Sequence, residues 1–191
     1  MTGAALAPHG RGIAEDALLD VTVRPREEGW QEVRPLAALV YPPEVLAGIV
    51  WRDVKWAEAD YWVLVHGQDR RLLSAVGMYL RNGRHDEEAV RIGGIGGVMT
   101  DPDHRGRGHA SAALRQADAL FRDHGVDLSL LVCEAKNVAF YGRLDWRVFP
   151  GAVIVEQPRW RGPFTIMSAM VKAVRKPAPA RGTIDLCGLP W

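Results

Sequence analysis

The stretch Val98-Met-Thr-Asp-Pro-Asp-His-Arg-Gly-Arg-Gly-His-Ala110 decides the fold of this 191-residue chain. It follows a glycine-rich strand predicted over Val90–Thr100 and precedes a predicted helix. The apolar residues of that helix repeat at the i, i+3, i+4, i+7 spacing of one buried stripe: Ala110, Ala113, Leu114, Ala117, Leu120 and Phe121. A strand–loop–helix unit points backbone N–H groups and the positive end of the helix dipole at one place, which suits an anion such as a phosphate.

Glycine is concentrated in the same region. The chain has 20 glycines, and six of them fall between Gly93 and Gly108. Clustered glycine indicates a backbone that something approaches closely. The dinucleotide pattern G-x-G-x-x-G and the P-loop pattern ending in Gly-Lys-Ser/Thr are both missing here, so neither of those phosphate sites is predicted.

Composition narrows the classes of function. Lys plus Arg number 24 and Asp plus Glu number 23, so there is no basic excess to favour nucleic acid as a partner. Apolar residues make up 48% of the chain, but no run approaches the roughly 18 residues of a membrane span. The two cysteines, Cys133 and Cys187, lack the spacing of a zinc site. We expect one cytoplasmic domain with no metal, and we assign the histidines His104 and His109 to the loop and the helix start.

Other segments predict an alternation of strands and helices. Strands are expected at Val21–Arg24, Tyr61–His66, Leu72–Leu80, Asp127–Cys133, Val148–Val155 and Phe164–Val174. Helices are expected at Glu27–Val40, Glu44–Val50 and Asn137–Leu144. Asn82-Gly83 predicts a hairpin turn. The apolar ending Ile184–Trp191 is expected to pack back onto the domain.

Two motifs resemble those of the GNAT N-acetyltransferase superfamily. The pattern R-x-x-G-x-A, at Arg105, Gly108 and Ala110, resembles the acetyl-CoA pyrophosphate loop Q/R-x-x-G-x-G/A of that superfamily. The segment Val138-Ala-Phe-Tyr-Gly-Arg-Leu-Asp-Trp146 resembles its second motif, A-x-x-x-Y-x-x-x-G-F, with Tyr141 on the tyrosine. This chain departs from the pattern in two places: Asp145-Trp146 replaces Gly-Phe, and Glu134 stands where the superfamily often has asparagine.

The resemblance implies an α/β (α+β) GNAT fold, with a mixed, mostly antiparallel central sheet flanked by helices. The expected domain spans 17–175, after a flexible tail at 1–16 and before a linker and docked segment at 176–191. It also implies an acetyl-CoA-dependent N-acetyltransferase acting on a small-molecule amine, with a homodimer as one candidate assembly. The implied cofactor contacts are Val98, Met99, Thr100, Arg105, Gly106, Arg107, Gly108, His109 and Ala110.

Acetyl transfer to an amine needs an acid, an oxyanion donor and a base. Tyr141 is the expected general acid for the departing thiolate, and a backbone N–H near Val98 or Met99 is the expected oxyanion donor. Glu88, with Asp86 nearby, is one candidate base. The other candidate is in the C-terminal segment, where the carboxylate of Asp185 or the terminal carboxylate of Trp191 is expected to bind or deprotonate the amine.

The acceptor pocket is expected to involve Trp51, Asp53, Trp56 and Asp185. Aromatic walls with a carboxylate suit a cationic amine, although core packing is the structural alternative for at least one tryptophan. The ending of the chain resembles that of aminoglycoside 2′-N-acetyltransferases, which also finish with a cysteine and a terminal tryptophan. An aminoglycoside-like amine is therefore one candidate acceptor.

Three other functions fit the same motifs. One is transfer of a longer acyl group, as in the nodulation N-acyltransferases of the superfamily, and another is acetylation of a protein. The third is a non-catalytic sensor of acyl-CoA. Tight CoA binding without turnover across a broad amine panel would indicate the sensor, whereas CoA release with an amine would indicate an enzyme.

Overall fold

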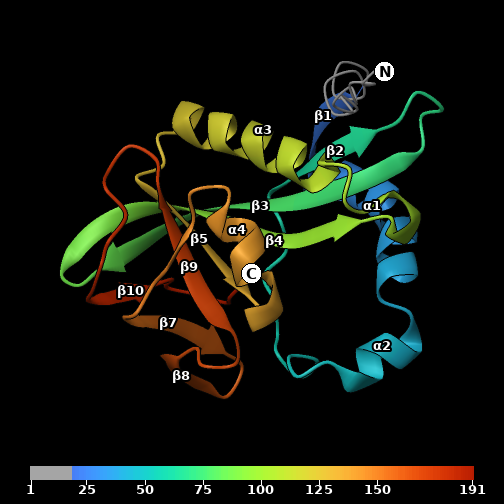
Figure 1. Ribbon diagram of the computed structural model, residues 1–191. Helices are drawn as coiled ribbons and strands as arrows, with labels where there is room; N and C mark the ends of the chain where they lie inside the picture. Colours follow the sequence, from blue (N-terminus) through green and yellow to red (C-terminus); the bar gives the residue numbers. More distant parts are fainter. Residues whose placement is uncertain (1–18) are drawn as a thin grey trace, which may run out of the picture.

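The computed structural model describes residues 19–191, so the tail predicted at 1–16 lies outside the described residues. The described chain forms one curved sheet with helices on both faces (Figure 1). Its strands are β1 (Asp20–Pro25), β2 (Tyr61–His66), β3 (Leu72–His85), β4 (Glu88–Thr100), β5 (Leu128–Cys133), β6 (Arg147–Val148), β7 (Ala152–Gln157), β8 (Trp160–Pro163), β9 (Ser168–Ala173) and β10 (Thr183–Asp185). Its helices are α1 (Arg26–Val40), α2 (Pro43–Gly48), α3 (His109–Asp123) and α4 (Val138–Gly142), with short 3₁₀ turns η2 (Pro102–His104) and η3 (Ala135–Asn137).

The sheet is mixed and mostly antiparallel, which confirms the expected fold class. Its main order is β6-β9-β5-β4-β3-β10-β7-β8, and β2 and β1 extend from the first half of β3. Among the described strands, only β4 with β5 and β10 with β7 run parallel. No helix within residues 19–191 is both long and apolar enough to cross a membrane.

Side chains alternate between two cores because successive residues of a strand point to opposite faces. In β2, Val63 and Val65 pack with α3, whereas Trp62 and Leu64 pack on the side of α1. The predicted stripe of α3 is largely buried, with Phe121 fully covered. Gly125 follows the helix with a positive φ of 68°, as a C-terminal stop requires.

The predicted turn at Asn82-Gly83 is wrong. β3 runs on to His85, and the hairpin turns at Asp86-Glu87, where Asp86 takes a φ of 50° and accepts a hydrogen bond from the Thr183 N–H at 2.7 Å. Gly83 has a different use, because a Cβ there would lie 2.5 Å from the Asp185 carbonyl oxygen of β10. Close approach of a neighbouring strand, rather than a turn, explains this glycine.

The C-terminal strands also differ from the prediction. The strand expected at Val148–Val155 is broken at Pro150-Gly151 into β6 and β7, and the last long strand begins at Ser168 rather than Phe164. β8 was not predicted, because its Trp-Arg-Gly-Pro sequence lacks a strand pattern. Its proline is tolerated because β8 pairs only with β7, at the edge of the sheet.

The feature that positions the site is the separation of β4 from β5. The two strands pair from Ile92 and Leu128 to Ile95 and Leu131, and their pairing ends there. β4 continues along β3 through a bulge, in which Gly97 and Val98 together oppose Val76 and Gly97 has a φ of 55°. Backbone groups of β4 beyond Ile95 are therefore not used by β5.

Candidate active site

The loop after β4 is anchored at Asp101, which is 1% exposed. Its N–H donates to the Leu73 carbonyl at 2.9 Å, and its carboxylate accepts from the Asp103 N–H at 3.0 Å and pairs with Arg71 at 2.5 Å. Burial opposes ionisation of this carboxyl, but the hydrogen bonds from Asp103 and His104 and the Arg71 charge outweigh it and lower the pKa of Asp101. The start of the loop is thus held to the beginning of β3.

The two glycines of the loop adopt left-handed backbone conformations. Gly106 has a φ of 75° and Gly108, the N-cap of α3, has a φ of 85°. No atom beyond the adjoining residues lies within 4 Å of a Cβ built on either, so the space beside them is open. Because the first N–H groups of a helix have no partner inside it, this exposed turn can receive a phosphate. Arg105 and Arg107 are exposed on the same turn.

The side chains of the other expected cofactor contacts lie in different environments. Val98 lines the pocket described below, whereas the Met99 side chain is buried in the core on the α1 side. The Thr100 hydroxyl lies 3.0 Å from the Ser74 hydroxyl on β3. His109 is 6% exposed at the start of α3, and its ring lies 6.5 Å from that of His104. Met99 and Thr100 could thus meet a ligand through their backbone but not through free side chains.

A pocket of about 240 Å³ occupies the opening between β4 and β5. It is lined by Tyr41, Trp51, Trp56, Tyr79, Ile95, Gly96, Gly97, Val98, Val132, Cys133, Glu134, Asn137, Tyr141, Met167 and Trp191. The structure therefore brings together five of the site residues predicted from the sequence: Trp51, Trp56, Val98, Tyr141 and Trp191. Glu134, at the position where the superfamily often has asparagine, also lines it.

Tyr141 reaches the pocket from α4. Its side chain is 7% exposed, and burial, followed by the neighbouring Cys133 and Tyr41, raises the pKa of its phenol well above the ordinary value. The phenol therefore keeps its proton at neutral pH. Trp146 packs edge-on against it, with ring centroids 6.4 Å apart. Asp145 adopts a φ of 66°, the conformation that the glycine of the superfamily motif would supply.

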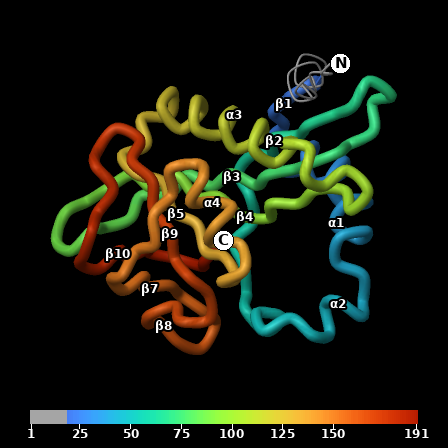
Figure 2. The backbone as a smooth tube through the Cα atoms, in the orientation of Figure 1, coloured from blue at the N-terminus to red at the C-terminus, as the bar shows by residue number. Residues whose placement is uncertain are grey.

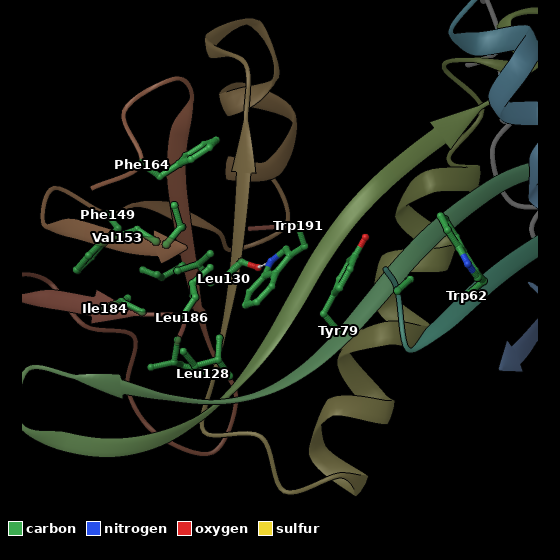
Figure 3. Close-up of a cluster of buried hydrophobic side chains, with 14 of the residues drawn as sticks. Trp62, Tyr79, Leu128, Leu130, Phe149, Val153, Phe164, Ile184, Leu186 and Trp191 are labelled. Carbon is green, nitrogen blue, oxygen red and sulfur yellow. Dashed lines mark hydrogen bonds between the residues drawn. The ribbon is translucent and has the colours of Figure 1, made fainter. Parts of the chain in front are cut away.

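The chain ends inside the molecule, beside β4 (Figure 2). The Trp191 indole stacks on Tyr79 at 5.5 Å, and its Nε1–H donates to the Leu130 carbonyl of β5 at 3.0 Å (Figure 3). Gly94 makes this seat possible, because a Cβ there would overlap the indole. A Cβ on Gly96 would lie 2.9 Å from the carboxyl carbon of Trp191. The terminal carboxyl group therefore lies against the wall of the pocket.

The preceding residues are held by hydrogen bonds to three parts of the fold. The Ala57 N–H donates to Pro190 at 2.7 Å, the Arg81 guanidinium to the Leu189 carbonyl at 3.0 Å, and the Glu156 N–H to the Gly188 carbonyl at 2.8 Å. Arg81 also lies over the Trp191 ring at 5.1 Å. The C-terminal segment is thus a fixed wall of the pocket.

Several residues singled out in the sequence lie elsewhere. Glu88 is exposed at the start of β4, eight residues before Gly96 and so about 25 Å along the strand. Asp86 is at the same end and bonds to Thr183. Asp53 is exposed beside Arg52 at 3.5 Å. The carboxylate of Asp185 is engaged by Arg161 and by the Cys187 N–H at 2.9 Å. None of these four carboxylates lines the pocket.

The glycine-rich strand also needs a correction. Gly93 and Gly94 do not line the pocket; they make room for Phe121 of α3 on one face and Trp191 on the other. Of the four glycines of β4, Gly96 and Gly97 line the pocket, so they are the ones beside which a ligand could approach the backbone. Sequence reasoning also missed Tyr41, Tyr79 and Met167 as lining residues. Tyr41 follows α1, Tyr79 is in β3 and Met167 precedes β9, so no local pattern links them.

Comparison with known proteins places the fold in a family. A model of the acetyltransferase (GNAT) domain matches residues 22–149. A comparison with curated proteins finds no match. Similar structures include the GNAT family N-acetyltransferase YhbS from Escherichia coli in complex with CoA, at 12% identity and a TM-score of 0.61, covering 88% of this chain and 89% of that one.

Two further solved structures agree in fold. ElaA from Escherichia coli is 15% identical, with a TM-score of 0.56 over 81% of this chain and 99% of that one. A GCN5-related N-acetyltransferase from Kribbella flavida is 19% identical, with a TM-score of 0.50 over 70% of this chain and 34% of that one. At these identities the likeness concerns the fold, and the match over residues 22–149 carries the assignment. The chain belongs to the GNAT acetyltransferase family.

Proposed function

We propose that this protein is an acetyl-CoA-dependent N-acetyltransferase that acetylates a primary amine of a small molecule. The observation that carries the proposal is the pocket at the β4–β5 opening, which Tyr141 and the C-terminal residue Trp191 both line. The exposed glycine turn of residues 105–108 leads into the N-terminus of α3, where the helix dipole is positive, and would hold the pyrophosphate of the cofactor. The pantetheine arm would then run along Gly96–Val98.

In the proposed reaction the amine attacks the thioester carbonyl directly. A C–N bond forms, the C–S bond breaks, and the proton lost by the amine replaces the acetyl group on the sulfur. Backbone N–H groups near the Gly97–Val98 bulge would stabilise the oxyanion. The buried Tyr141 phenol, which keeps its proton, would donate to the departing thiolate.

The terminal carboxylate of Trp191 is the proposed binder or base for the amine. Its position supports this role, because it lies against Gly96 in the pocket wall, whereas Glu88 is at the far end of β4. A covalent acetyl-cysteine route is disfavoured. Burial raises the pKa of Cys133, the cysteine that lines the pocket, to about 11, so little nucleophilic thiolate is present at neutral pH.

The finer expectations remain proposals. The resemblance of the C-terminal ending makes an aminoglycoside-like amine one candidate acceptor, and transfer of a longer acyl group and a non-catalytic acyl-CoA sensor are the alternative functions. The cytoplasmic location and the homodimer are predictions from the sequence. A screen of acetyl-CoA turnover over aminoglycosides, polyamines, amino acids and apolar amines, read as thiol release, separates enzyme from sensor.

CoA binding tests the cofactor half of the proposal separately. Valine cannot adopt the φ of 85° at Gly108, so Gly108→Val should turn the loop N–H groups away from the phosphates. We expect at least a hundredfold loss of CoA affinity by isothermal titration calorimetry, equivalent to about 2.7 kcal/mol. Gly48→Val is the control, because Gly48 has open space and no positive φ. Equal CoA affinity in wild type and Gly108→Val would remove the loop from the site.

A further inference from the structure

The acceptor side of the pocket is walled by aromatic rings at right angles to one another. Tyr41, at the end of α1, meets Trp51 at 5.8 Å and 84°, and Trp51 meets Trp56 at 5.7 Å and 87°. Phe164, just after β8, supports Trp56 at 5.9 Å and 67°. Within each perpendicular pair the electropositive edge of one ring rests on the face of the other, and the ring faces that stay free towards the pocket are the surfaces that attract an ammonium group.

The rest of the lining is also poor in charge. Met167 and the stacked rings of Tyr79 and Trp191 also line the pocket. Glu134 is the one charged side chain among the described lining residues, and Lys136 pairs with it at 2.7 Å. A polyamine or aminoglycoside would bring several cations into this lining, and most of them would lose water without meeting a free carboxylate.

A neighbouring hollow, which shares Trp56 with the pocket, is lined by three carboxylates, Glu58, Asp60 and Glu156, but also by three cations, Arg26, Lys55 and Arg81. Arg26 pairs with Glu58 at 3.2 Å and with Asp60 at 3.0 Å, and Asp60 also accepts from the Leu80 N–H at 2.8 Å. The hollow therefore offers a polycation little uncompensated negative charge.

The volume of the pocket also favours a small acceptor with few charges. At about 240 Å³, the pocket is smaller than the roughly 300–1,000 Å³ typical of sites for drug-sized ligands, and the acetyl end of the cofactor must share it. We propose that the acceptor is a compact primary amine of the arylalkylamine class, in which a short alkyl chain joins a single cation to an aromatic ring. This rests on the proposed function. The apolar group lies against Trp51 and Trp56, and the ammonium, before it gives up its proton, lies between ring faces and the terminal carboxylate.

The test measures amine binding in the presence of CoA, so that it does not depend on turnover. Isothermal titration calorimetry compares phenethylamine with putrescine and tobramycin on wild type, Trp51→Leu and Trp160→Leu. Trp160 is the matched control, because it is an exposed tryptophan on β8 outside the pocket. We expect phenethylamine to bind at least tenfold tighter than either polyamine, and Trp51→Leu to weaken it about tenfold while Trp160→Leu does not.

The outcomes separate the two proposals. Putrescine or tobramycin binding as tightly as phenethylamine overturns the acceptor class, as does phenethylamine binding that is unchanged in Trp51→Leu. In either case acetyl transfer to the polar amine would leave the N-acetyltransferase proposal standing. Trp51-dependent binding of phenethylamine without acetylation of any amine supports the assigned ligand class and overturns the proposed catalysis.

Discussion

Gly94→Ala tests whether the position of the Trp191 side chain beside β4 shapes the acceptor pocket. The added methyl group would overlap the Trp191 indole, which is 4% exposed, rigid and unable to move into the sheet. The indole must leave its position, and with it go the hydrogen bond to Leu130 and the stack on Tyr79.

The magnitude follows from what is lost and what is regained. An aromatic side chain of this kind buries roughly 200 Å², worth about 5 kcal/mol at about 25 cal/mol per Å², and the hydrogen bond adds about 1 kcal/mol. Release of Leu189–Trp191 returns about 1 kcal/mol of backbone entropy per residue. The net loss of folding stability is therefore about 2–3 kcal/mol, a drop in Tm of roughly 5–10 °C for a chain of this length.

The assay is thermal unfolding combined with steady-state kinetics. We expect the lower Tm, a raised KM for the amine acceptor and a CoA affinity within about twofold of wild type, because Gly94 does not line the pocket. Gly48→Ala, where a Cβ meets open space, should change stability by less than about 0.5 kcal/mol. An unchanged Tm for Gly94→Ala would show that Trp191 does not occupy this seat. A lowered Tm with an unchanged amine KM would remove the tail from the acceptor site.

Three further changes have expected outcomes. Tyr141→Phe should lower kcat about 10²–10⁴-fold without altering the Kd for CoA. Because burial raises the pKa of the Tyr141 phenol, deprotonation of this group should not lower the wild-type kcat up to about pH 10. A Phe variant with full kcat would refute the role of Tyr141 as the acid. Deleting Leu189–Trp191 should raise the amine KM, and a stable truncation with wild-type kinetics would argue against an acceptor role. Asp101→Asn should cost about 1–3 kcal/mol in urea unfolding at pH 7. Because the pKa of Asp101 is lowered in the folded state, its stabilising effect is fully present above the ordinary value of 3.8 and is lost as the pH falls through the folded pKa. The difference in the free energy of unfolding between wild type and Asp101→Asn should therefore shrink below pH 3.8. A difference that is independent of pH would contradict this.

Local sequence patterns predicted the elements whose structure depends on residues that are close together in the chain. The stripe of α3 and the glycines of its preceding loop were visible in sequence, because helix periodicity and positive φ leave direct marks on residue choice. The motif tyrosine likewise falls on a short helix at the opening. Asp145 shows the limit of this reasoning. An aspartate at this position weakened the match to the second motif, yet its φ of 66° gives the backbone conformation that the motif glycine would adopt.

The remaining features depend on contacts between distant segments. Asn82-Gly83 has the composition of a turn, yet Gly83 is needed for the approach of β10. Gly94 accommodates a tryptophan 97 positions later, and no periodicity encodes that pairing. Glu88 was a candidate base because it begins the right strand, but the length of β4 carries it away from the pocket.

The most direct test of the account is the product balance of a single turnover. Purified protein in excess over acetyl-CoA is mixed with phenethylamine, and mass spectrometry quantifies the N-acetylated amine against the CoA released. The account predicts one acetyl amide for each CoA, with the rate of amide formation strongly reduced in Tyr141→Phe. CoA released without amide, or acetyl-CoA left intact across the whole amine panel, would contradict the assignment of this pocket as an N-acetyltransferase site.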